Sequence, residues 1–283
     1  MIDETVAEIE AMQTHSSSVV AVKAAEALRE LADREYPAVE EYCRTIERNS
    51  RALRRANPSH ASLHTTQRRI VEAVTDPTPD SVEDARERTR DVIDTVIEEV
   101  ESAKERAAQR GAQLLANGDT LLTHDFSTTV IAAIEAALDA GVAFDVYVTE
   151  ARPRYIGRKT ARRLADYDAV DVTLIVDSAS GHYLADCDRV VVGMDCIVEE
   201  TLYNRVGTYP IAATAADLGV PVTVIGSSAK IIDGGFAFEN EHRAAAEVMR
   251  EPSEGFAVEN PAYDATPTRL LDTVVTDDET IEF

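Results

Sequence analysis

The chain has 283 residues, long enough for two domains with full hydrophobic cores. It carries 52 acidic against 28 basic residues, a formal net charge of −24. Such a surface repels nucleic acid and anionic membranes at ordinary salt, so we expect no direct nucleic-acid partner and no membrane association. Because concentrated salt screens this self-repulsion, the acidic composition predicts a halophilic host.

The cysteines and histidines give no sign of a disulfide framework or a metal centre. Cys43, Cys187 and Cys196 are an odd number without a CxxC pair, and no signal-peptide pattern opens the chain. A cytoplasmic location follows as the expectation. No apolar run approaches the roughly 18 residues that span a bilayer. The histidines never fall into HExxH or a similar spacing, so we expect no metal.

The first 117 residues have the pattern of helices, with little β-branched alternation and no glycine before Gly111. Shorter helical patterns cover residues 19–31, 36–56 and 63–74. Ser81 offers a helix N-cap, and Asp84 three residues later approximates a capping box. From there an amphipathic pattern continues to Leu115, which predicts one helix of roughly 30 residues.

The second helical pattern ends in an arginine-rich run. Its members are Arg48, Arg51, Arg54 and Arg55. The run could bind an anion, but a solvated helix face is the favoured interpretation.

From Gly118 onward the texture changes to apolar, β-branched runs separated by helical patterns. The runs cover residues 120–122, 144–148, 172–176, 189–192, 221–225 and 273–275. Near-continuous apolar strands alternating with helices are typical of a parallel sheet covered on both faces. We therefore predict an α/β fold with an all-helical domain over 1–117 and a Rossmann-like parallel-sheet domain over 118–283. The second domain lacks GxGxxG and GxxxxGK[ST], so we expect no cofactor.

Polar residues gather where each predicted strand ends, and the carboxyl ends of parallel strands share one crevice. They are His124, Asp125 and Ser127; Glu150, Arg152, Pro153 and Arg154; Asp177 and Ser178; Asp195, Asn204 and Arg205; and Ser227, Ser228 and Lys230. The backbone N–H groups of the helix that follows the first strand also favour anions. A basic and hydroxyl lining suits a phosphate. Structural ion pairs of the basic side chains with Glu150, Asp177 and Asp195 are an equally open interpretation.

Five sequence pieces, in order, resemble the family of the translation initiation factor 2B alpha, beta and delta subunits. They are GDTLLTH at 118–124, EARP at 150–153, VVVGMD at 190–195, NRVGT at 204–208 and NPAYDATP at 260–267. Methylthioribose-1-phosphate isomerase and ribose-1,5-bisphosphate isomerase are metabolic relatives in that family. The resemblance implies a helical domain, a Rossmann-like domain, and dimers or larger oligomers of identical or related subunits.

Departures from the isomerase pattern fall at the site itself. The resemblance places Asp125 at the position of the isomerases' catalytic cysteine, whereas Asp195 matches their catalytic aspartate. Asn204 and Arg205 match their substrate-binding Asn-Lys pair. Their N-terminal Arg-Gly-Ala phosphate loop has no match near residues 15–20, which read HSSSVV. An ionised Asp125 would repel a phosphorylated sugar unless Arg205 or Lys230 neutralises it.

Two functions follow from the resemblance. The first is a non-catalytic regulatory subunit that contacts related subunits or initiation factor 2 and senses a phosphorylated small molecule or nucleotide. The alternative is an aldose–ketose sugar-phosphate isomerase in which Asp125 and Asp195 form a carboxylate pair, one of which should titrate high. The lost cysteine favours the first. In either case His124, Ser127, Arg152, Asn204, Arg205, Ser227 and Lys230 are the predicted ligand-binding residues.

Overall fold

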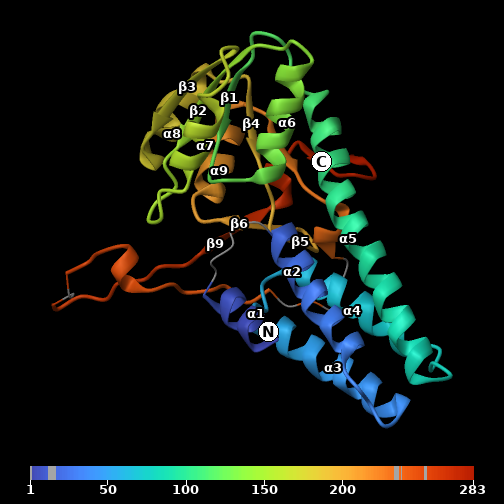
Figure 1. Cartoon of the computed structure of the whole chain (residues 1–283). Coiled ribbons are helices and arrows are strands. Elements are labelled where there is room, and N and C mark those ends of the chain that lie inside the picture. The colour runs from blue at the N-terminus through green and yellow to red at the C-terminus, as the bar shows by residue number, and fades with distance from the viewer. Residues whose placement is uncertain (1, 12–16, 233–235, 237, 252–253) are drawn as a thin grey trace. The chain divides into compact units, whose positions relative to one another are not determined.

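The computed structural model describes residues 2–11, 17–232, 236, 238–251 and 254–283. Residues near 15–20, where the resemblance leads one to look for a phosphate loop, fall partly outside the described residues. The chain forms two compact units, 1–103 and 104–283. The change from helix to sheet predicted at 117/118 lies between the last helix of the N-terminal half and the first strand (Figure 1). The assignment of 1–117 as a domain stays a prediction.

The N-terminal half is helical, as the sequence predicts. Its helices are α1 (Ile2–Glu10), α2 (Ser17–Arg29), α3 (Val39–Ala56), α4 (Ala61–Thr75) and α5 (Val82–Ala112). The predicted cap of the long helix is present, since Ser81 Oγ accepts a hydrogen bond from the Asp84 backbone N–H at 3.1 Å. The Asp84 carboxylate in turn accepts from the Asp80 backbone N–H at 2.9 Å. These bonds satisfy N–H groups that a helix start otherwise leaves unpaired.

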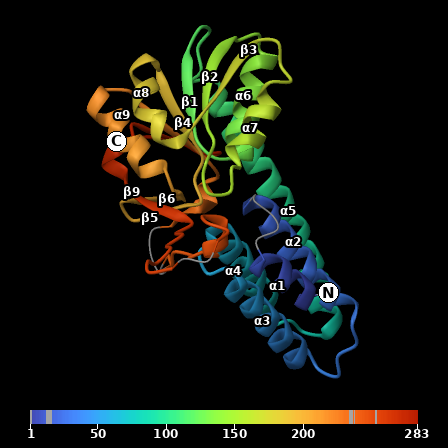
Figure 2. The same ribbon diagram turned by 90° about the vertical axis from the view of Figure 1, so that its left-hand side faces the viewer.

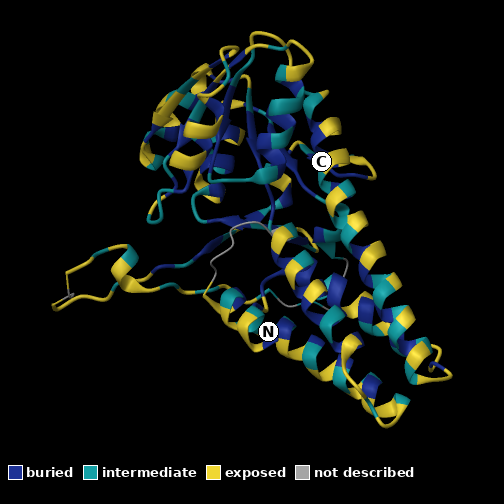
Figure 3. Cartoon of the chain, viewed as in Figure 1, coloured by how far each residue is buried: buried dark blue, intermediate teal, exposed yellow. Residues whose placement is uncertain are grey.

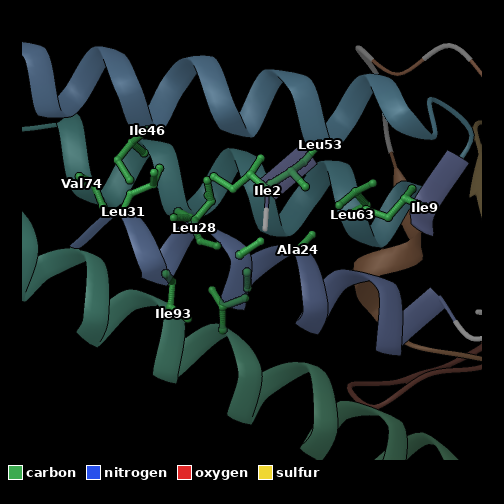
Figure 4. Close-up of a cluster of buried hydrophobic side chains, with 14 of the residues drawn as sticks. Ile2, Ile9, Ala24, Leu28, Leu31, Ile46, Leu53, Leu63, Val74 and Ile93 are labelled. Atoms are coloured by element: carbon green, nitrogen blue, oxygen red, sulfur yellow. The ribbon is translucent and has the colours of Figure 1, made fainter. Parts of the chain in front are cut away.

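Aliphatic side chains from these helices form one core, with charged side chains on the outward faces. Leu28, Leu31, Ile46, Leu53 and Leu63 are fully buried in it (Figure 4). Burying a side chain of this size contributes about 1.5–3 kcal/mol. In the arginine-rich run of α3, Arg48, Arg51 and Arg55 are exposed, in line with a solvated helix face.

The second unit is built on a seven-stranded sheet of order β11-β10-β7-β4-β1-β2-β3, in which β11 alone is antiparallel. Its strands are β1 (Thr120–Thr123), β2 (Phe144–Thr149), β3 (Val170–Ile175), β4 (Arg189–Val192), β7 (Val222–Ile225), β10 (Thr273–Val275) and β11 (Thr280–Glu282). All six predicted runs are strands of this sheet. The central strands are buried on both faces, which explains their unbroken apolar sequences (Figure 3).

Helices connect the parallel strands. They are α6 (Thr128–Asp139), α7 (Gly157–Leu164), α8 (Ser180–Tyr183) and α9 (Thr208–Leu218). A βα connection of this kind places the loop after each strand at the carboxyl edge of the sheet. The mostly parallel sheet confirms the predicted α/β class.

A smaller sheet, of order β8-β5-β6-β9, was not predicted from the sequence. Its strands are β8 (Ile231–Ile232), β5 (Cys196–Val198), β6 (Thr201–Arg205) and β9 (Tyr263–Pro267). It lies at the carboxyl ends of the large sheet, because β4 runs through Asp195 directly into β5 (Figures 1 and 2). The β5–β6 turn could not be predicted, because it consists of Glu199-Glu200 and lacks the glycine or asparagine typical of such turns. Glu199 nevertheless adopts a left-handed φ of 52°.

Candidate active site at the carboxyl end of the sheet

The loop after β1 holds Asp125 in a left-handed backbone conformation, with φ 69°. Aspartate tolerates this region better than most residues. Thr160 Oγ1 fixes the loop by donating a hydrogen bond to the Asp125 carbonyl oxygen at 2.6 Å. The Asp125 Oδ2 atom lies 3.2 Å from Arg205 Nε, and the two side chains are only 13% and 10% exposed. The other carboxylate oxygen, Oδ1, is buried with no hydrogen-bond partner among the described residues.

A second acidic and basic pair lies beside this ion pair. Burial raises the pKa of Asp195, and the Asp125 charge raises it further, while Arg205 and Lys230 act in the opposite direction. Burial lowers the pKa of Lys230. The Lys230 Nζ atom donates a hydrogen bond to the Met194 carbonyl oxygen at 2.8 Å, next to Asp195 in the chain. Two acids and two bases therefore meet where β4, β6 and the loop after β1 end.

The arrangement gives the two carboxyl groups different surroundings. Asp125 is paired with a guanidinium group, whereas Asp195 is surrounded by protein that disfavours its charged form. A difference of this kind allows one carboxyl to donate a proton and the other to accept one. The Arg205 charge also offsets the repulsion that an ionised Asp125 would exert on a phosphorylated ligand.

Two of the predicted ligand-binding residues, His124 and Ser127, make internal contacts. The His124 ring nitrogens lie 2.6 Å from Thr149 Oγ1 and 2.9 Å from the Val206 carbonyl oxygen. Ser127 Oγ accepts a hydrogen bond from the Val130 backbone N–H at 3.3 Å and caps α6. A ligand would have to displace these bonds, so a direct binding role for either residue stays a prediction.

Close backbone approaches hold the same two residues in place. A Cβ atom on Gly207 would lie 2.7 Å from the His124 ring, and the glycine has a φ of 112°. A Cβ atom on Gly193 would lie 2.4 Å from Ser127 Oγ. Glycine is needed at both positions for packing, and at Gly207 for the backbone conformation as well.

Of the remaining predicted ligand-binding residues, some make hydrogen bonds within the protein and others are exposed. Asn204 Nδ2 donates to Thr208 Oγ1 at 3.0 Å, and Ser227 Oγ accepts from the Ala229 backbone N–H at 3.3 Å. The Arg152 guanidinium lies 5.3 Å from the ring of Tyr155 and the residue is exposed. The alternative interpretation, in which the basic side chains pair with Glu150, Asp177 and Asp195, is met only in part. Glu150 pairs with Arg158, and Asp177 accepts the backbone N–H groups of Ala151 and Arg152.

Two residues of the NPAYDATP segment also lie at the site, Asp264 and Tyr263, and neither follows a predicted strand. Asp264 Oδ2 accepts the backbone N–H groups of Gly207 at 2.7 Å and Tyr209 at 3.0 Å, so a carboxylate of the chain occupies the start of α9. The Tyr263 ring lies 5.2 Å from the Arg205 guanidinium. Burial and the nearby Asp195 raise the pKa of Tyr263. Both residues come from β9, a strand whose pairing with β6 the sequence pattern did not reveal.

Neither a metal centre nor a membrane segment appears in the part of the chain that the structure describes. No group of three or more histidine, cysteine, aspartate or glutamate side chains there could hold a metal ion. Within the same residues, every helix is too short or too polar to cross a bilayer.

A profile described as the initiation factor 2 subunit family matches residues 13–281. This match covers nearly the whole chain, so the protein belongs to that family.

Curated relatives in the family include isomerases. The chain is similar to ribose 1,5-bisphosphate isomerase of Haloterrigena turkmenica, with 38% identity over 179 residues, covering 58% of this chain and 54% of that protein. It is also similar to methylthioribose-1-phosphate isomerase of Xylella fastidiosa, with 34% identity over 172 residues, covering 57% and 48%. The alignments thus span about half the length of these relatives.

Among solved structures, the chain resembles the translation initiation factor eIF-2B of Pyrococcus horikoshii OT3. The two share 25% identity with a TM-score of 0.83, and the match covers 99% of this chain and 96% of that one. The relatives thus include both isomerases and an initiation factor, the two functions that the resemblance leaves open.

Proposed function

We propose that this protein is an aldose–ketose isomerase acting on a phosphorylated pentose, of the ribose 1,5-bisphosphate or methylthioribose 1-phosphate type. The observation that carries the proposal is the pair of unlike carboxyl groups, Asp125 bound to Arg205 and Asp195 with a raised pKa. The identity of the curated relatives supports the same choice. The isomerase proposal replaces the hypothesis of a non-catalytic regulatory subunit, which the missing cysteine by itself favours.

The proposed chemistry needs only an acid and a base. Isomerisation of an aldose to a ketose moves a hydrogen between neighbouring carbons and leaves the atom count unchanged, so no cofactor is consumed. Asp195 delivers its proton to the ring oxygen as the sugar ring opens, and it regains a proton from the C2 hydroxyl as the ketone forms. Asp125 takes the proton from C2 and returns it to C1, so both carboxyl groups end in their starting states. Arg205 keeps Asp125 in position, and Lys230 holds the Met194 carbonyl and with it the backbone at Asp195.

A phosphorus NMR time course in about 1 M KCl, salt that screens the acidic surface, tests this proposal. Ribose 1,5-bisphosphate and methylthioribose 1-phosphate are offered separately, and new ketose-phosphate signals are expected with one of them. Asp195→Asn should abolish the signals. Asp171→Asn, which changes an exposed carboxylate at the start of β3, is the matched control and should convert substrate at the original rate. Absence of conversion by the folded wild-type protein with both substrates would contradict the proposal.

A regulatory subunit is the second candidate, favoured by a specific observation. The resemblance places Asp125 where the isomerases carry their catalytic cysteine, and the match to the eIF-2B structure extends over nearly both whole chains. In this role the protein assembles with itself or with related subunits, contacts initiation factor 2, and binds a phosphorylated ligand without converting it. Affinity capture at high salt that recovers initiation factor 2, combined with NMR line broadening but no turnover, is its expected signature.

The setting of the protein is also a proposal. The net charge of −24 and the cysteine usage support a cytoplasmic location in a salt-rich cell. Unfolding or dissociation of subunits below about 1 M KCl is the expected behaviour, because dilute salt no longer screens the acidic surface. Full stability and unchanged subunit assembly in dilute buffer would contradict it.

A further inference from the structure

Arg205 faces two carboxyl groups but contacts only one of them. Its Nε atom lies 3.2 Å from Asp125 Oδ2, and no ion pair joins it to Asp195 in the part of the chain that the structure describes. Burial lowers the pKa of Arg205, but the charges of Asp125 and Asp195 outweigh burial and raise it. The Arg205 Nη1 atom is buried without a hydrogen-bond partner among the described residues, so a donor remains for either aspartate. Charge alone therefore does not decide which aspartate the guanidinium contacts.

The ring of Tyr263 lies against this guanidinium. Arg205 and Tyr263 are paired residues of the antiparallel strands β6 and β9, which places their side chains on the same face of the small sheet. The Tyr263 ring centroid is 5.2 Å from Arg205 Cζ, within the roughly 6 Å range of a cation–π contact. Tyr263 is only 4% exposed, so water screens this contact little. The ring thus limits the positions that the guanidinium can take.

Tyr263 is itself held from two sides. Asn240 Nδ2 donates a hydrogen bond to the Tyr263 carbonyl oxygen at 2.8 Å, and Asn240 Oδ1 accepts from the Tyr263 backbone N–H at 3.2 Å. The ring of Phe238 contacts Tyr263 edge-on, with centroids 5.3 Å apart, and stacks on Tyr203 at 3.9 Å. A ring that is fixed through its backbone and by a neighbouring ring is a rigid support for Arg205.

Tyr263 supports Arg205 as a neutral side chain. Burial raises the pKa of Tyr263, and the charge of Asp195 raises it further, while Arg205 acts in the opposite direction. The phenol therefore stays uncharged where the aspartates titrate, and it does not compete with them for the guanidinium. Its effect on Arg205 comes from the ring.

We propose that Tyr263 is a positioning residue, which keeps Arg205 on Asp125 and away from Asp195. A guanidinium stabilises the charged form of the carboxyl group that it contacts, so this choice determines which aspartate is ionised and which keeps its proton. In the proposed isomerase, on which this role rests, the choice makes Asp125 the base and Asp195 the acid. Tyr263 acts through Arg205 and touches no reacting atom.

The titration of Asp195 reports the position of Arg205. Burial and the Asp125 charge raise the pKa of Asp195, whereas Arg205 lowers it. Within this set of groups, Arg205 is the one that the Tyr263 ring contacts. The titratable and charged groups around Asp195 come from the loops after β1 and β7, from β5, β6 and β9, and from the segment before β9. They are Asp125, Lys230, Cys196, Arg205, Tyr263 and Arg243.

A pH titration of the infrared C=O band of protonated Asp195 tests this role without any turnover. Tyr263→Leu removes the ring and frees Arg205 to pair with Asp195, so the midpoint of band loss should fall by about one pH unit or more. Tyr263→Phe keeps the ring and should keep the wild-type midpoint. Tyr147→Leu is the matched control, because it removes a tyrosine ring that packs against Tyr183 at 4.7 Å, and it should also keep the midpoint. Tyr263→Met, a flexible side chain without a ring, takes the place of Tyr263→Leu if that variant does not fold.

A second background separates movement of Arg205 from entry of water. In a protein with Asp125→Asn and Arg205→Gln the guanidinium is absent, so adding Tyr263→Leu should not move the midpoint further. Both partners of the ion pair are replaced together, which avoids leaving a lone buried charge. A midpoint that still falls in this background would show that the missing ring only admits water to Asp195, and would overturn the positioning role.

The outcomes also separate this role from the proposed function. If the midpoint falls in Tyr263→Leu but not in Tyr263→Phe, and the wild-type protein converts neither sugar phosphate, the positioning role stands and the isomerase falls. In an active isomerase, Tyr263→Leu should lower kcat about tenfold or more and change KM less, because the carboxyl pair acts on the reacting atoms. If a substrate is converted and Tyr263→Leu keeps both the wild-type midpoint and kcat, the positioning role is wrong and the isomerase stands. An equal shift in Tyr147→Leu would trace the effect to packing in general and overturn the role as well.

Discussion

The two ends of the seven-stranded sheet differ in size, charge and chemistry. At the amino end of β1, β2 and β3 lies the larger hollow, about 310 Å³, lined by the exposed carboxylates of Asp145, Asp168 and Asp171. At the carboxyl end the free space is far smaller, yet two acidic and two basic side chains meet there. Exposed charges are solvated individually, whereas buried ones must satisfy each other.

Cavity volume therefore does not mark the candidate site in this protein, whereas the convergence of loops does. Every loop after a parallel strand reaches the carboxyl end, so residues distant in the sequence meet there. The four-stranded sheet adds Asn204, Arg205 and Tyr263 at the same end. Burial there raises the pKa of Asp195, and shifted pKa values of this kind are typical of functional sites.

The largest expected effect comes from breaking the buried ion pair. Arg205→Gln leaves the Asp125 carboxylate largely buried without its partner, which should lower the free energy of unfolding by about 3–5 kcal/mol in urea titrations. Arg163→Gln removes an exposed arginine from its pair with Glu135 and should lower it by less than about 1 kcal/mol. Adding Asp125→Asn to Arg205→Gln should restore part of the loss. Equal effects of the two single variants would show that burial does not distinguish the pairs.

Isomerase activity should fall when the proposed acid at the carboxyl end is replaced, but not when a carboxylate at the amino end is replaced. Asp195→Asn keeps the shape of the side chain, but a carboxamide is too weak an acid to protonate the sugar. The value of kcat/KM should therefore fall by at least about 10²-fold. Asp171→Asn at the amino end should keep the wild-type value. The rates come from the phosphorus NMR assay with the preferred substrate. Full activity of Asp195→Asn would remove this residue from the proposed mechanism.

Gly207 at the carboxyl end of the sheet and Gly118 at the amino end both have a positive φ, so their alanine variants can be compared directly. Gly207→Ala combines backbone strain with a clash against the His124 ring, and should lower the free energy of unfolding by about 1–3 kcal/mol. Gly118→Ala, at the amino end, has a φ of 89° but nothing within 4 Å of the added Cβ. Its loss, from backbone strain alone, should be the smaller of the two. Thermal unfolding of both variants measures the difference, and a larger loss for Gly118→Ala would contradict the packing of His124.

The smallest effect is a slope of stability with pH. Because the pKa of Asp195 is raised in the folded state, the folded protein holds a proton that the unfolded chain has lost. Stability should therefore fall as pH rises from the ordinary aspartate pKa, about 3.9, through the raised one. The slope is at most about 1.4 kcal/mol per pH unit for one proton. Asp195→Asn should flatten it and Asp171→Asn should not, in urea midpoints measured across this range.

Lys230 affects the same profile at higher pH in the opposite sense. Its pKa is lowered by burial, so the folded protein loses this proton before the unfolded chain does. Stability should rise with pH between the lowered pKa and the ordinary lysine value of about 10.4. The Lys230→Met variant should lack this rise, and a rise that persists in it would assign the effect to another group.

The fold could be predicted from the sequence wherever a local pattern determined it. Six strands, the long helix α5 and the Ser81 cap follow from unbroken apolar runs, helical spacing and capping chemistry. The small sheet could not be predicted, because β5 to β6 turns through Glu199-Glu200 and β9 pairs with β6 from about 60 residues away.

The site was predictable as a set of strand ends, but not as a set of contacts. The sequence placed Asp125, Asp195, Arg205 and Lys230 at one edge, and only the structure selects Arg205 as the partner of Asp125, 80 residues away in the chain.

The most direct test of the account is the protonation state of Asp195. Infrared spectra in about 1 M KCl, recorded at a pH where an ordinary aspartate with a pKa of about 3.9 is ionised, detect the C=O band of a protonated carboxyl group. The account predicts such a band in the wild-type protein and in Asp171→Asn, and its loss in Asp195→Asn. A wild-type spectrum without the band, or a band that persists in Asp195→Asn, would contradict the central claim that the carboxyl end of the sheet holds a proton ready for transfer.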